Sequence, residues 1–367
     1  MKKLLRNLVL ILNILFAASL LVAYLAPIVN PSKIFLPALF GLAYPYLLLI
    51  NLLFIFYFLV RLKKTFLLSL IVVLIGWNHL SNLIPIHFKK KTPPEKLEQS
   101  ESLHLLSYNV RSFNLYDWAK EPKAKEEIFR MISEKDPDII CLQEFYTTPK
   151  VGCTEEYIDN KLSATPHKSV YYSFSGRHES YWGIATYSKF PILKMSRIPF
   201  SNSQNAAMYS DIKIGNDTVR VFNLHLQSIK FRERNFAFMD SLKFKYSEDQ
   251  VAEFRDIGSH LKQAFILRSE QSTVISNYIK QSPYPVILMG DFNDTPVSFA
   301  YRKIKKGMKD AFRTSGKGFG STYSGELPSF RIDFIFYSDP FQSANFERTK
   351  IKYSDHYPIE TLLYLPE

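Results

Sequence analysis

The chain has 367 residues, with 46 Lys or Arg against 34 Asp or Glu, which gives a formal net charge of +12. Residues 1–91 contain ten of the basic residues and no acidic residue, so the remaining chain carries a net charge of only +2. The basic excess lies beside apolar segments, where membrane topology accounts for it better than nucleic-acid binding does. The two cysteines, Cys141 and Cys153, have no zinc-type spacing with histidines and leave a disulfide between them open.

Three apolar segments begin the chain, at residues 4–26, 34–60 and 66–86. Crossing a bilayer takes about 20 apolar residues, so the sequence predicts three transmembrane helices. A cleaved signal peptide is the alternative for the first segment, because small residues occur near its end. Pro37 and Pro45 interrupt the second segment, and a spanning helix with neighbours tolerates prolines.

The charges of the short loops predict an orientation. Three basic residues, Lys2, Lys3 and Arg6, lie at the N-terminus and three lie between the second and third segments, whereas only Lys33 lies between the first and second. The positive-inside rule then places the N-terminus in the cytoplasm. With three spans, the sequence predicts a multi-pass protein of the inner (cell) membrane whose C-terminal part lies outside the cytoplasm. The basic run at residues 89–91 argues against this orientation, since those residues would lie outside.

A charged, proline-containing stretch follows the apolar segments and has the composition of a linker. We therefore divide the chain into a membrane domain (residues 1–88), a linker (89–102) and a globular domain (103–367). Strand-like patterns dominate the globular domain, at residues 103–110, 138–144, 169–174, 182–188, 208–214, 218–226, 286–289, 331–337 and 359–363. Helical patterns cover residues 124–135, about 250–280 and 297–305. Many strands and few helices favour two packed sheets flanked by helices.

One strand ends in residues that suit metal or phosphate chemistry. The apolar run at residues 286–289 stops at Gly290 and is followed by Asp291 and Asn293. In an extended segment, residues two apart face the same way. A carboxylate and an amide on one side suit a hard cation such as Mg2+, or the orientation of water beside an anion. A turn of the Asx type after the strand is the alternative.

Other strands also end in polar residues, each of which alone is usually a solvated turn or a hydrogen-bonded core residue. They are Asn109, Gln143, Glu144, Asn223, His225 and Asp355. Asp333 differs from these, because it lies between Ile332 and Phe334, and burying its carboxylate is costly without a partner. His356 is the natural partner, since the carboxylate would fix its tautomer and support the imidazolium.

Taken together, these motifs resemble those of the endonuclease/exonuclease/phosphatase (DNase I-like) superfamily. In chain order they are Asn109, Gln143-Glu144, Asn223-x-His225, Gly290-Asp-Phe-Asn293, Arg331-Ile-Asp333 and Ser354-Asp-His356. That superfamily includes DNase I-like nucleases, abasic-site endonucleases, neutral sphingomyelinases and inositol polyphosphate phosphatases. The resemblance spans about residues 103–365. It implies a four-layer α/β sandwich, a requirement for Mg2+ or Mn2+, and hydrolysis of a phosphoester.

The resemblance also implies roles for individual residues. Glu144 resembles the main metal ligand, with Asn109 beside it and Asp355 as a further carboxylate of the metal site. Asp291 resembles the residue that orients or deprotonates the attacking water. Asn293 resembles its neighbour that contacts the phosphate.

Further roles follow in the same way. His356, paired with Asp333, resembles the group that stabilises the phosphoryl charge. His225, with Asn223 two residues before it, matches the Asn/Thr-x-His strand of DNase I-like enzymes and sphingomyelinases, which implies substrate contacts. Tyr181 stands where abasic-site endonucleases carry a phosphate-contacting tyrosine, and a packing tyrosine is the alternative.

One position departs from the pattern. Some nucleases of this superfamily have an acidic residue two positions after the first asparagine, where this chain has Arg111. The missing carboxylate favours one principal metal ion over two. Arg111 would contact the substrate phosphate, and a surface arginine is the alternative.

The resemblance predicts a metal-dependent phosphoesterase, tethered to the membrane, that cleaves a phosphodiester or phosphomonoester by in-line attack of water. We prefer a nuclease-like phosphodiesterase acting on nucleic acid. The alternative is a sphingomyelinase-like or phosphoinositide-phosphatase-like hydrolase of phospholipid head groups, because a tether raises the local concentration of lipid substrate. A non-enzymatic membrane-anchored binding module is the least favoured hypothesis, and no protein partner is predicted.

Overall fold

The computed structural model describes residues 2–85, 102–115, 121–201, 203–230, 234–235, 238, 248–325 and 328–364. Its contacts divide the chain into two compact units. The first unit consists of Met1–Ile84, Ile229–Ser272 and Asp294–Lys303. The second consists of Pro85–Ser228, Thr273–Asn293 and Ile304–Glu367. The proposed linker lies almost wholly outside the described residues, so the division of the chain at residues 89–102 stays a prediction.

The N-terminal apolar segments are helical, but only the first is a single long helix. Their helices are α1 (Lys2–Ala23), α2 (Leu36–Leu42), α3 (Tyr44–Val60), α4 (Phe66–Ile75) and α5 (Trp77–Leu83). The second segment bends by 67° between α2 and α3, and the third bends by 70° between α4 and α5. Pro45 lies in the first turn of α3, where its missing N–H and fixed φ stop α2 from continuing. Gly76 separates α4 from α5.

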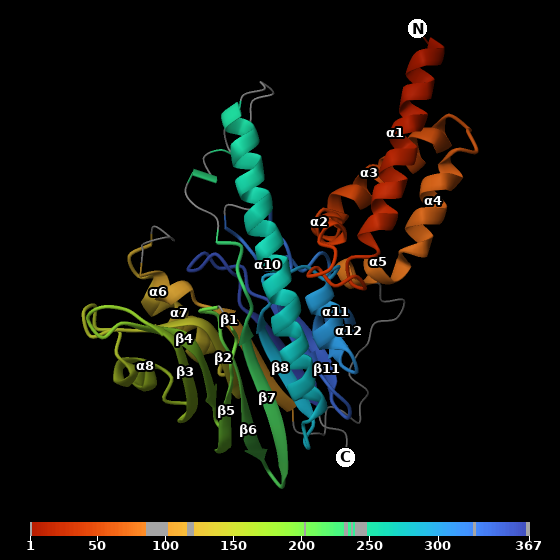
Figure 1. Cartoon of the computed structure of the whole chain (residues 1–367). Coiled ribbons are helices and arrows are strands. Elements are labelled where there is room, and N and C mark those ends of the chain that lie inside the picture. The colour runs from red at the N-terminus through yellow and green to blue at the C-terminus, as the bar shows by residue number, and fades with distance from the viewer. Residues whose placement is uncertain are drawn as a thin grey trace. The chain divides into compact units, whose positions relative to one another are not determined.

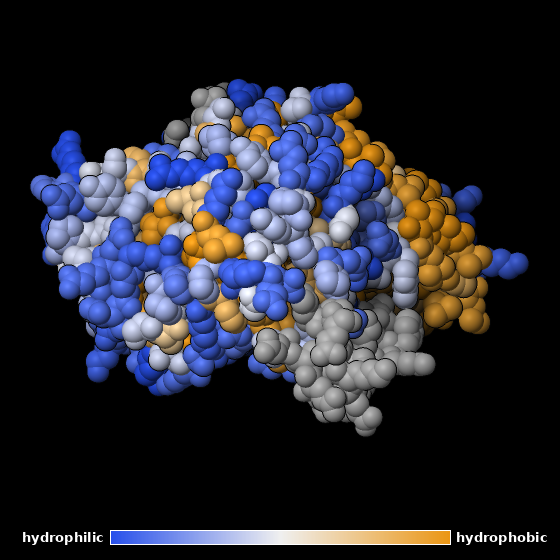
Figure 2. All heavy atoms as spheres, turned by 90° about the horizontal axis from the view of Figure 1, so that it is seen from below, coloured by the Kyte–Doolittle hydropathy of each residue, from blue (hydrophilic) through white to orange (hydrophobic). Residues whose placement is uncertain are grey.

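By length and composition, α1 is the one single helix among the described residues that could cross a membrane. Up to three spans are possible if each bent pair counts as one span. Their outward side chains are apolar: Leu8, Phe56 and Ile75 are 51%, 68% and 65% exposed. The surface of these helices is largely hydrophobic, whereas the surface of the sheets is mostly hydrophilic (Figure 2). Apolar faces of this extent indicate a lipid or protein surrounding.

Two sheets of six strands form the rest of the fold (Figure 1). The first sheet has the order β11-β12-β1-β2-β4-β3, with β1 (Ser102–Asn109), β2 (Ile139–Thr147), β3 (His167–Ser175), β4 (Tyr181–Ser188), β11 (Gln342–Arg348) and β12 (Ile359–Tyr364). The second has the order β5-β6-β7-β8-β10-β9, with β5 (Ile192–Ile198), β6 (Ala207–Ile214), β7 (Asp217–His225), β8 (Val286–Asp291), β9 (Lys309–Asp310) and β10 (Asp333–Tyr337). The other helices are α6 (Arg111–Asn114), α7 (Ala124–Lys135), α8 (Glu155–Lys161), α10 (Glu248–Lys280), α11 (Phe299–Lys305) and α12 (Ala311–Ser315).

Each sheet contains one parallel pair of strands, and the pairs determine where functional side chains can gather. β1 runs parallel to β2, and β7 runs parallel to β8, with His225 opposite Asp291. All other pairings are antiparallel, and β10 begins with Asp333 opposite Asp291. The carboxyl ends of a parallel pair lie at the same edge of a sheet, which is the usual place for a ligand in α/β folds.

The main core lies between the two sheets. Leu105 and Cys141 from the first sheet pack there with Val221, Met289 and Ile335 from the second. Both cysteines of the chain are buried and free, so the disulfide left open above is absent. The apolar interior between two mixed sheets confirms the predicted α/β sandwich.

Helices cover the outer faces of the sheets. Ile128 and Phe129 of α7 pack against Leu142 of the first sheet. The ring of Tyr278, near the end of α10, contacts the ring of Tyr209 in β6, with 6.2 Å between their centroids. The order helix, sheet, sheet, helix gives the four layers that the sequence predicted.

Candidate active site

Polar side chains from both sheets meet at one edge of the sandwich. Asn109 ends β1, His225 ends β7 and Asp291 ends β8. Glu144 lies within β2, directly after Gln143, which is opposite Asn109, and Asp333 begins β10 opposite Asp291. Because the strands of each parallel pair end together, residues far apart in the sequence become neighbours there. We call Asn109, Glu144, Asp291, Asp333, Asp355, His225 and His356 the carboxylate cluster.

Asn109 connects the two sheets directly. Its Nδ2 donates to Glu144 Oε1 at 3.2 Å and to Asp291 Oδ2 at 3.0 Å. Its Oδ1 accepts the backbone N–H of Arg111 at 3.0 Å. The amide nitrogen therefore holds two carboxylates side by side, and ligation of a metal by the amide oxygen would require the Asn109 side chain to turn over.

Glu144 reaches Asn109 because β2 is irregular at this residue. The pairing of β2 with β4 shifts register between Leu142 and Phe145, and Glu144 has a φ of +49°. A bulge of this kind redirects a side chain away from the regular alternation of a strand. Glu144 thereby leaves the alternation of β2 and faces Asn109.

Backbone geometry also fixes the carboxylate of Asp291. Gly290 has a φ of +151°, and a Cβ there would lie 2.0 Å from the carbonyl oxygen of Leu224, so only glycine fits. Asn293, at a φ of +51°, donates its backbone N–H to Asp291 Oδ1 at 2.7 Å. The Asn293 side chain donates to Leu226 O at 3.0 Å and to Asp291 Oδ2 at 3.2 Å. Both oxygens of Asp291 are therefore oriented by hydrogen bonds.

His356 and Asp333 form the pair that the sequence predicted. Nδ1 of His356 lies 2.9 Å from Asp333 Oδ2, and Nε2 lies 3.7 Å from Asp291 Oδ2. The ring is 4% exposed and meets the ring of Tyr323 edge-on, with centroids 5.4 Å apart. The imidazole is thus placed between two carboxylates and can carry a positive charge toward the cluster.

Sequence reasoning assigned no role to Ser354 or Tyr323. Ser354 Oγ donates to the carbonyl oxygen of Asn109 at 2.8 Å and accepts the N–H of His356 at 3.2 Å. This hydroxyl joins the end of β1 to the loop that carries His356. The Ser-Asp-His motif contained Ser354, but a serine beside two ionisable groups gives no separate signal, and nothing in the sequence singled out Tyr323.

His225 faces the same carboxylates from β7. Its Nε2 lies 3.6 Å from Asp291 Oδ2 and 3.9 Å from Glu144 Oε1. That nitrogen is buried and, among the described residues, has no partner within hydrogen-bonding distance. A buried polar atom of this kind needs a partner, which a substrate oxygen could supply.

Arg111 meets the cluster from the loop after β1. Its guanidinium forms an ion pair with the carboxylate of Asp355, and both side chains are 17% exposed. Asp355 also accepts a hydrogen bond from Ser354 Oγ at 3.3 Å. Arg111 is therefore a largely buried, paired cation beside Asp355, and its contact with a substrate phosphate stays a prediction.

Burial and like charges shift the pKa values of the cluster. Burial raises the pKa of Glu144, and the neighbouring Asp355 adds to the effect. Burial likewise raises the pKa of Asp291 to about 6. Burial lowers the pKa of His225. For His356, burial acts in the lowering direction, but the carboxylates of Asp333 and Asp291 outweigh it and raise its pKa well above 6.5.

The donors in this cluster fit a divalent cation. Ligand atoms of Asp291, Asp333 and His356 lie within 4.8 Å of one another, so this buried group could hold a metal ion. Within this group, His356 Nδ1 and Asp333 Oδ2 already lie 2.9 Å apart as a hydrogen-bonded pair. Glu144 and Asp355 are neighbouring carboxylates whose mutual repulsion a hard cation would relieve.

Two of the residues predicted for the site lie apart from the cluster. Asn223 is fully buried, and its Nδ2 donates to Ala185 O at 2.8 Å while its Oδ1 accepts from Gln143 Nε2 at 2.8 Å. Its amide is thus engaged in hydrogen bonds within the core between the sheets. Tyr181 is 39% exposed and packs against the ring of Tyr172, with centroids 5.3 Å apart. The described residues show no contact between Tyr181 and the cluster.

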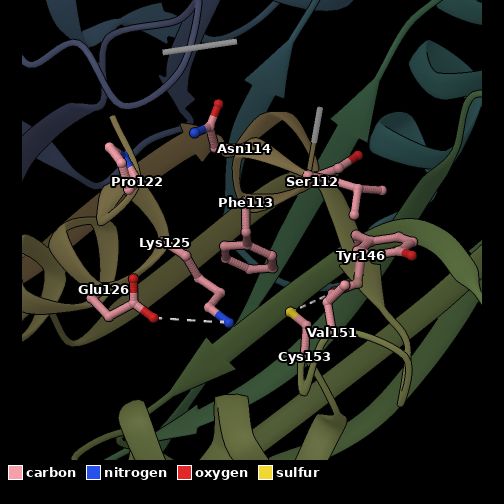
Figure 3. A pocket seen from close by; sticks show the side chains of 10 residues that line it. Ser112, Phe113, Asn114, Pro122, Lys125, Glu126, Tyr146, Val151 and Cys153 are labelled. Atoms are coloured by element: carbon pink, nitrogen blue, oxygen red, sulfur yellow. Dashed lines mark hydrogen bonds and ion pairs between the residues drawn. The ribbon is translucent and has the colours of Figure 1, made fainter. Parts of the chain in front are cut away.

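A cavity of about 240 Å³ lies beside the residues that follow Asn109 and Glu144 in the chain. Figure 3 shows Lys125 and Glu126 on one side of it, Tyr146 and Val151 on the other, and Phe113 between them. Its lining is partly apolar and partly charged: the aromatic rings of Phe113 and Tyr146 line it together with Lys125 and Glu126, whose charged groups lie 3.9 Å apart. No residue of the carboxylate cluster lines this cavity.

Comparison with protein families gives two matches. The profile of the Endonuclease/Exonuclease/phosphatase family matches residues 106–356, which include every residue of the carboxylate cluster. A second profile, for a domain of unknown function, matches residues 6–83. Among curated proteins, none matches this chain.

Solved structures share the fold. The endonuclease/exonuclease/phosphatase of Bacteroides vulgatus is 18% identical with a TM-score of 0.52, and the match covers 72% of this chain and 99% of that one. The corresponding protein of Beutenbergia cavernae is 15% identical with a TM-score of 0.51, covering 72% of each chain. TDP2 of D. rerio, complexed with a single-strand DNA product, is 16% identical with a TM-score of 0.50, covering 72% and 99%. At these identities the likeness concerns the fold alone.

Proposed function

This chain belongs to the Endonuclease/Exonuclease/phosphatase family, and from that premise we propose that it is a divalent-metal-dependent phosphoester hydrolase. The observation that carries the proposal is the Asn109 amide, which holds the Glu144 and Asp291 carboxylates together at 3.2 and 3.0 Å. Two carboxylates held this close repel each other and destabilise the fold, so a functional role explains their position better than a structural one.

The residues of the cluster divide the chemistry among them. Asp291 accepts a proton from the attacking water, and its orientation is set by Asn293 and Asn109. His356, kept positive by Asp333, and His225 donate to the phosphoryl oxygens as charge develops on them.

The family implies a metal, for which the donors of this cluster are suited. A divalent cation, Mg2+ or Mn2+, held by Glu144 with Asp355 and Asn109 as further candidates, would neutralise charge on the phosphate oxygens. Asn293 is the candidate for direct contact with the phosphate, because it reaches the cluster from a loop at its edge, whereas Arg111 is engaged by Asp355.

For the substrate we propose a phosphodiester, with a nuclease-like phosphodiesterase as the preferred activity. Hydrolysis of lipid head groups is the second candidate, and the exposed apolar faces of α1, α3 and α4 favour it. An enzyme held in a bilayer meets lipid phosphate at high local concentration. We further propose that the bent pairs α2–α3 and α4–α5 each cross the membrane, with the sheets outside the cytoplasm.

One experiment separates the two substrates. Full-length protein in detergent is incubated with plasmid DNA and, separately, with mixed phospholipid vesicles, each with Mg2+ and with chelator. We expect Mg2+-dependent cleavage of the DNA, and no cleavage by the matched Asp291→Asn variant. Release of head groups alone would move the assignment to lipid, and activity that survives the chelator would refute the metal requirement.

Orientation is tested on intact cells. Both native cysteines are buried, so a single cysteine at the exposed turn residue Asn216 reports its own accessibility. We expect a membrane-impermeant thiol reagent to label the Asn216→Cys variant without lysis. Labelling only after lysis would place the sheets in the cytoplasm.

A further inference from the structure

The short element α6 (Arg111–Asn114), which carries Arg111, is a left-handed turn and not a regular α-helix. Arg111, Ser112, Phe113 and Asn114 all have positive φ angles, of 43°, 53°, 53° and 61°, and none of them is glycine. Residues with a Cβ avoid this region because the Cβ approaches the backbone, and asparagine tolerates it better than most. Four such residues in a row persist only where the surrounding structure fixes them, and such strain concentrates at functional sites.

Arg111 is held both at its backbone N–H and at its guanidinium group. Its backbone N–H donates to Asn109 Oδ1 at 3.0 Å, and its guanidinium pairs with Asp355. Asp355 is tied in turn through Ser354, whose Oγ donates to the carbonyl oxygen of Asn109 at 2.8 Å. The guanidinium therefore occupies a defined place and is not a mobile surface charge.

The position of this cation divides the carboxylates of the cluster into two kinds. Asp355 already has a permanent positive partner, because an arginine does not lose its proton in proteins. Glu144 instead faces the neutral amide of Asn109 at 3.2 Å and the ring of His225 at 3.9 Å. Glu144 feels the charges of His356 and Arg111 less strongly than the cost of its own burial. A hard divalent ion therefore gains more from Glu144 than from Asp355, whose carboxylate is already paired with Arg111.

We propose that Arg111 is a built-in cation that occupies Asp355 and thereby limits the site to a single divalent ion, held at Glu144. This inference rests on the proposed metal-dependent hydrolase. It makes Arg111 a positioning residue that acts on the metal site through Asp355. It also removes Asp355 from the ligands of the ion as long as the ion pair is intact.

The test counts bound ions on the full-length protein in detergent. Mn2+ binding is measured by calorimetry and by electron paramagnetic resonance of the free ion, with wild type, Arg111→Asn and a control, Arg177→Asn. Arg177 is an exposed arginine of the same unit, so its removal changes the total charge equally. Asparagine tolerates positive φ, so Arg111→Asn is expected to fold at least as stably as wild type, which thermal unfolding checks.

We expect one Mn2+ in wild type and in Arg177→Asn, and a second, weaker Mn2+ in Arg111→Asn. The second ion should disappear again in the double variant Arg111→Asn with Asp355→Asn, because its ligand is then missing. Two ions in wild type, or one ion in Arg111→Asn, would overturn the inference and leave the hydrolase proposal intact. A wild type that binds no Mn2+ would overturn both.

Discussion

Two groups of polar residues lie between the same two sheets, one fully buried and one partly exposed, and they differ in how their charges are balanced. In the first group, Gln143 and Asn223 satisfy each other and the backbone: Gln143 Nε2 donates to Asn223 Oδ1 at 2.8 Å and to Cys141 O at 3.2 Å. In the second, the carboxylate cluster, Glu144 and Asp291 lie on either side of one amide. The groups are adjacent along β2, where Glu144 follows Gln143, and only Leu224 separates Asn223 from His225 along β7.

The difference separates a structural role from a functional one. A neutral, hydrogen-bonded network stabilises the fold, because each donor and acceptor has a partner. Carboxylates that crowd together destabilise the fold until a proton, a cation or a substrate arrives. Substitutions in the two groups should therefore have opposite effects on stability and activity.

Asp291→Asn is expected to give the largest effect on activity, a loss of about 10²- to 10⁴-fold, because it removes the proton acceptor. The same change should stabilise the ion-free protein at neutral pH. The folded-state pKa of Asp291, about 6, lies above its ordinary value of 3.8, so ionisation weakens the fold as pH rises through this interval. The gain in unfolding free energy, measured by urea titration in chelator, should be on the order of 1 to 3 kcal/mol.

The matched control is Asp211→Asn. Asp211 is a buried carboxylate of β6 that accepts two hydrogen bonds from Arg220, at 2.7 and 2.9 Å. Its removal leaves a buried arginine without its partner and should lower the unfolding free energy by about 3 kcal/mol. A loss of stability in both variants would show that the cluster is structural and would remove the basis of the comparison.

Asp333→Asn should give the next largest effect, and it changes the pH profile. In wild type, kcat/KM rises as Asp291 ionises near pH 6 and falls where His356 loses its proton, well above pH 6.5. The Asp333 carboxylate is the largest influence that raises the pKa of His356. Its loss should move the alkaline limb of the profile to lower pH and reduce kcat by about 10²-fold.

An alkaline limb that stays in place in Asp333→Asn would show that His356 is not the group titrating there. A solvent-exposed control, Asp217→Asn, should leave both limbs unchanged. Profiles of kcat/KM report groups of the free enzyme, so they are the relevant measurement.

The sequence located much of the carboxylate cluster because its members follow strong local signals. Asp291 comes after a glycine that ends an apolar strand, and Asp333 interrupts an apolar run that then needs a charged partner. Both signals reflect the cost of burying a carboxylate. Strands β5, β9 and β11 gave no comparable signal, since they lie at or next to sheet edges and are stabilised by their neighbours.

Other features could not be predicted because they depend on contacts distant in the sequence. The assignment of Asn223 to substrate binding followed from the resemblance of Asn223-x-His225 to the superfamily's Asn/Thr-x-His strand, whose two polar residues share one strand face. The structure shows that this face continues into the core, where Asn223 meets Ala185. The orientation of the Asn109 amide and the pairing of Arg111 with Asp355 likewise depend on the loop that returns at Ser354.

Asn223→Leu should have the opposite effects to Asp291→Asn: it should lower the stability of the fold and leave most of the activity. The leucine preserves the volume but leaves Gln143 Nε2 and the carbonyl of Ala185 without the partner they have now. Unsatisfied buried groups should lower the unfolding free energy by about 2 to 4 kcal/mol. Activity per folded molecule, measured well below the melting temperature, should fall by less than about tenfold, since no hydrogen bond of the cluster is removed.

Asn216→Leu is the matched control for that change, because Asn216 lies in an exposed turn between β6 and β7. It should alter the unfolding free energy by less than about 0.5 kcal/mol. Abolished activity in a stably folded Asn223→Leu protein would return Asn223 to the substrate site and erase the boundary between the two groups.

Tyr181→Phe should give the smallest effect, and it tests where the carboxylate cluster ends. The ring of Tyr181 packs on Tyr172 and is 39% exposed, so phenylalanine keeps its packing and loses only the hydroxyl. Without a contact to the cluster among the described residues, that hydroxyl should matter little, and kcat/KM should change by less than about threefold, which corresponds to less than about 0.7 kcal/mol. A loss of 10²-fold or more, at unchanged stability, would mean that the hairpin of β3 and β4 closes onto the substrate. The active site would then extend beyond the ends of the parallel strands. The comparison between the hydrogen-bonded Gln143–Asn223 pair and the carboxylate cluster would no longer include every residue that acts on the substrate.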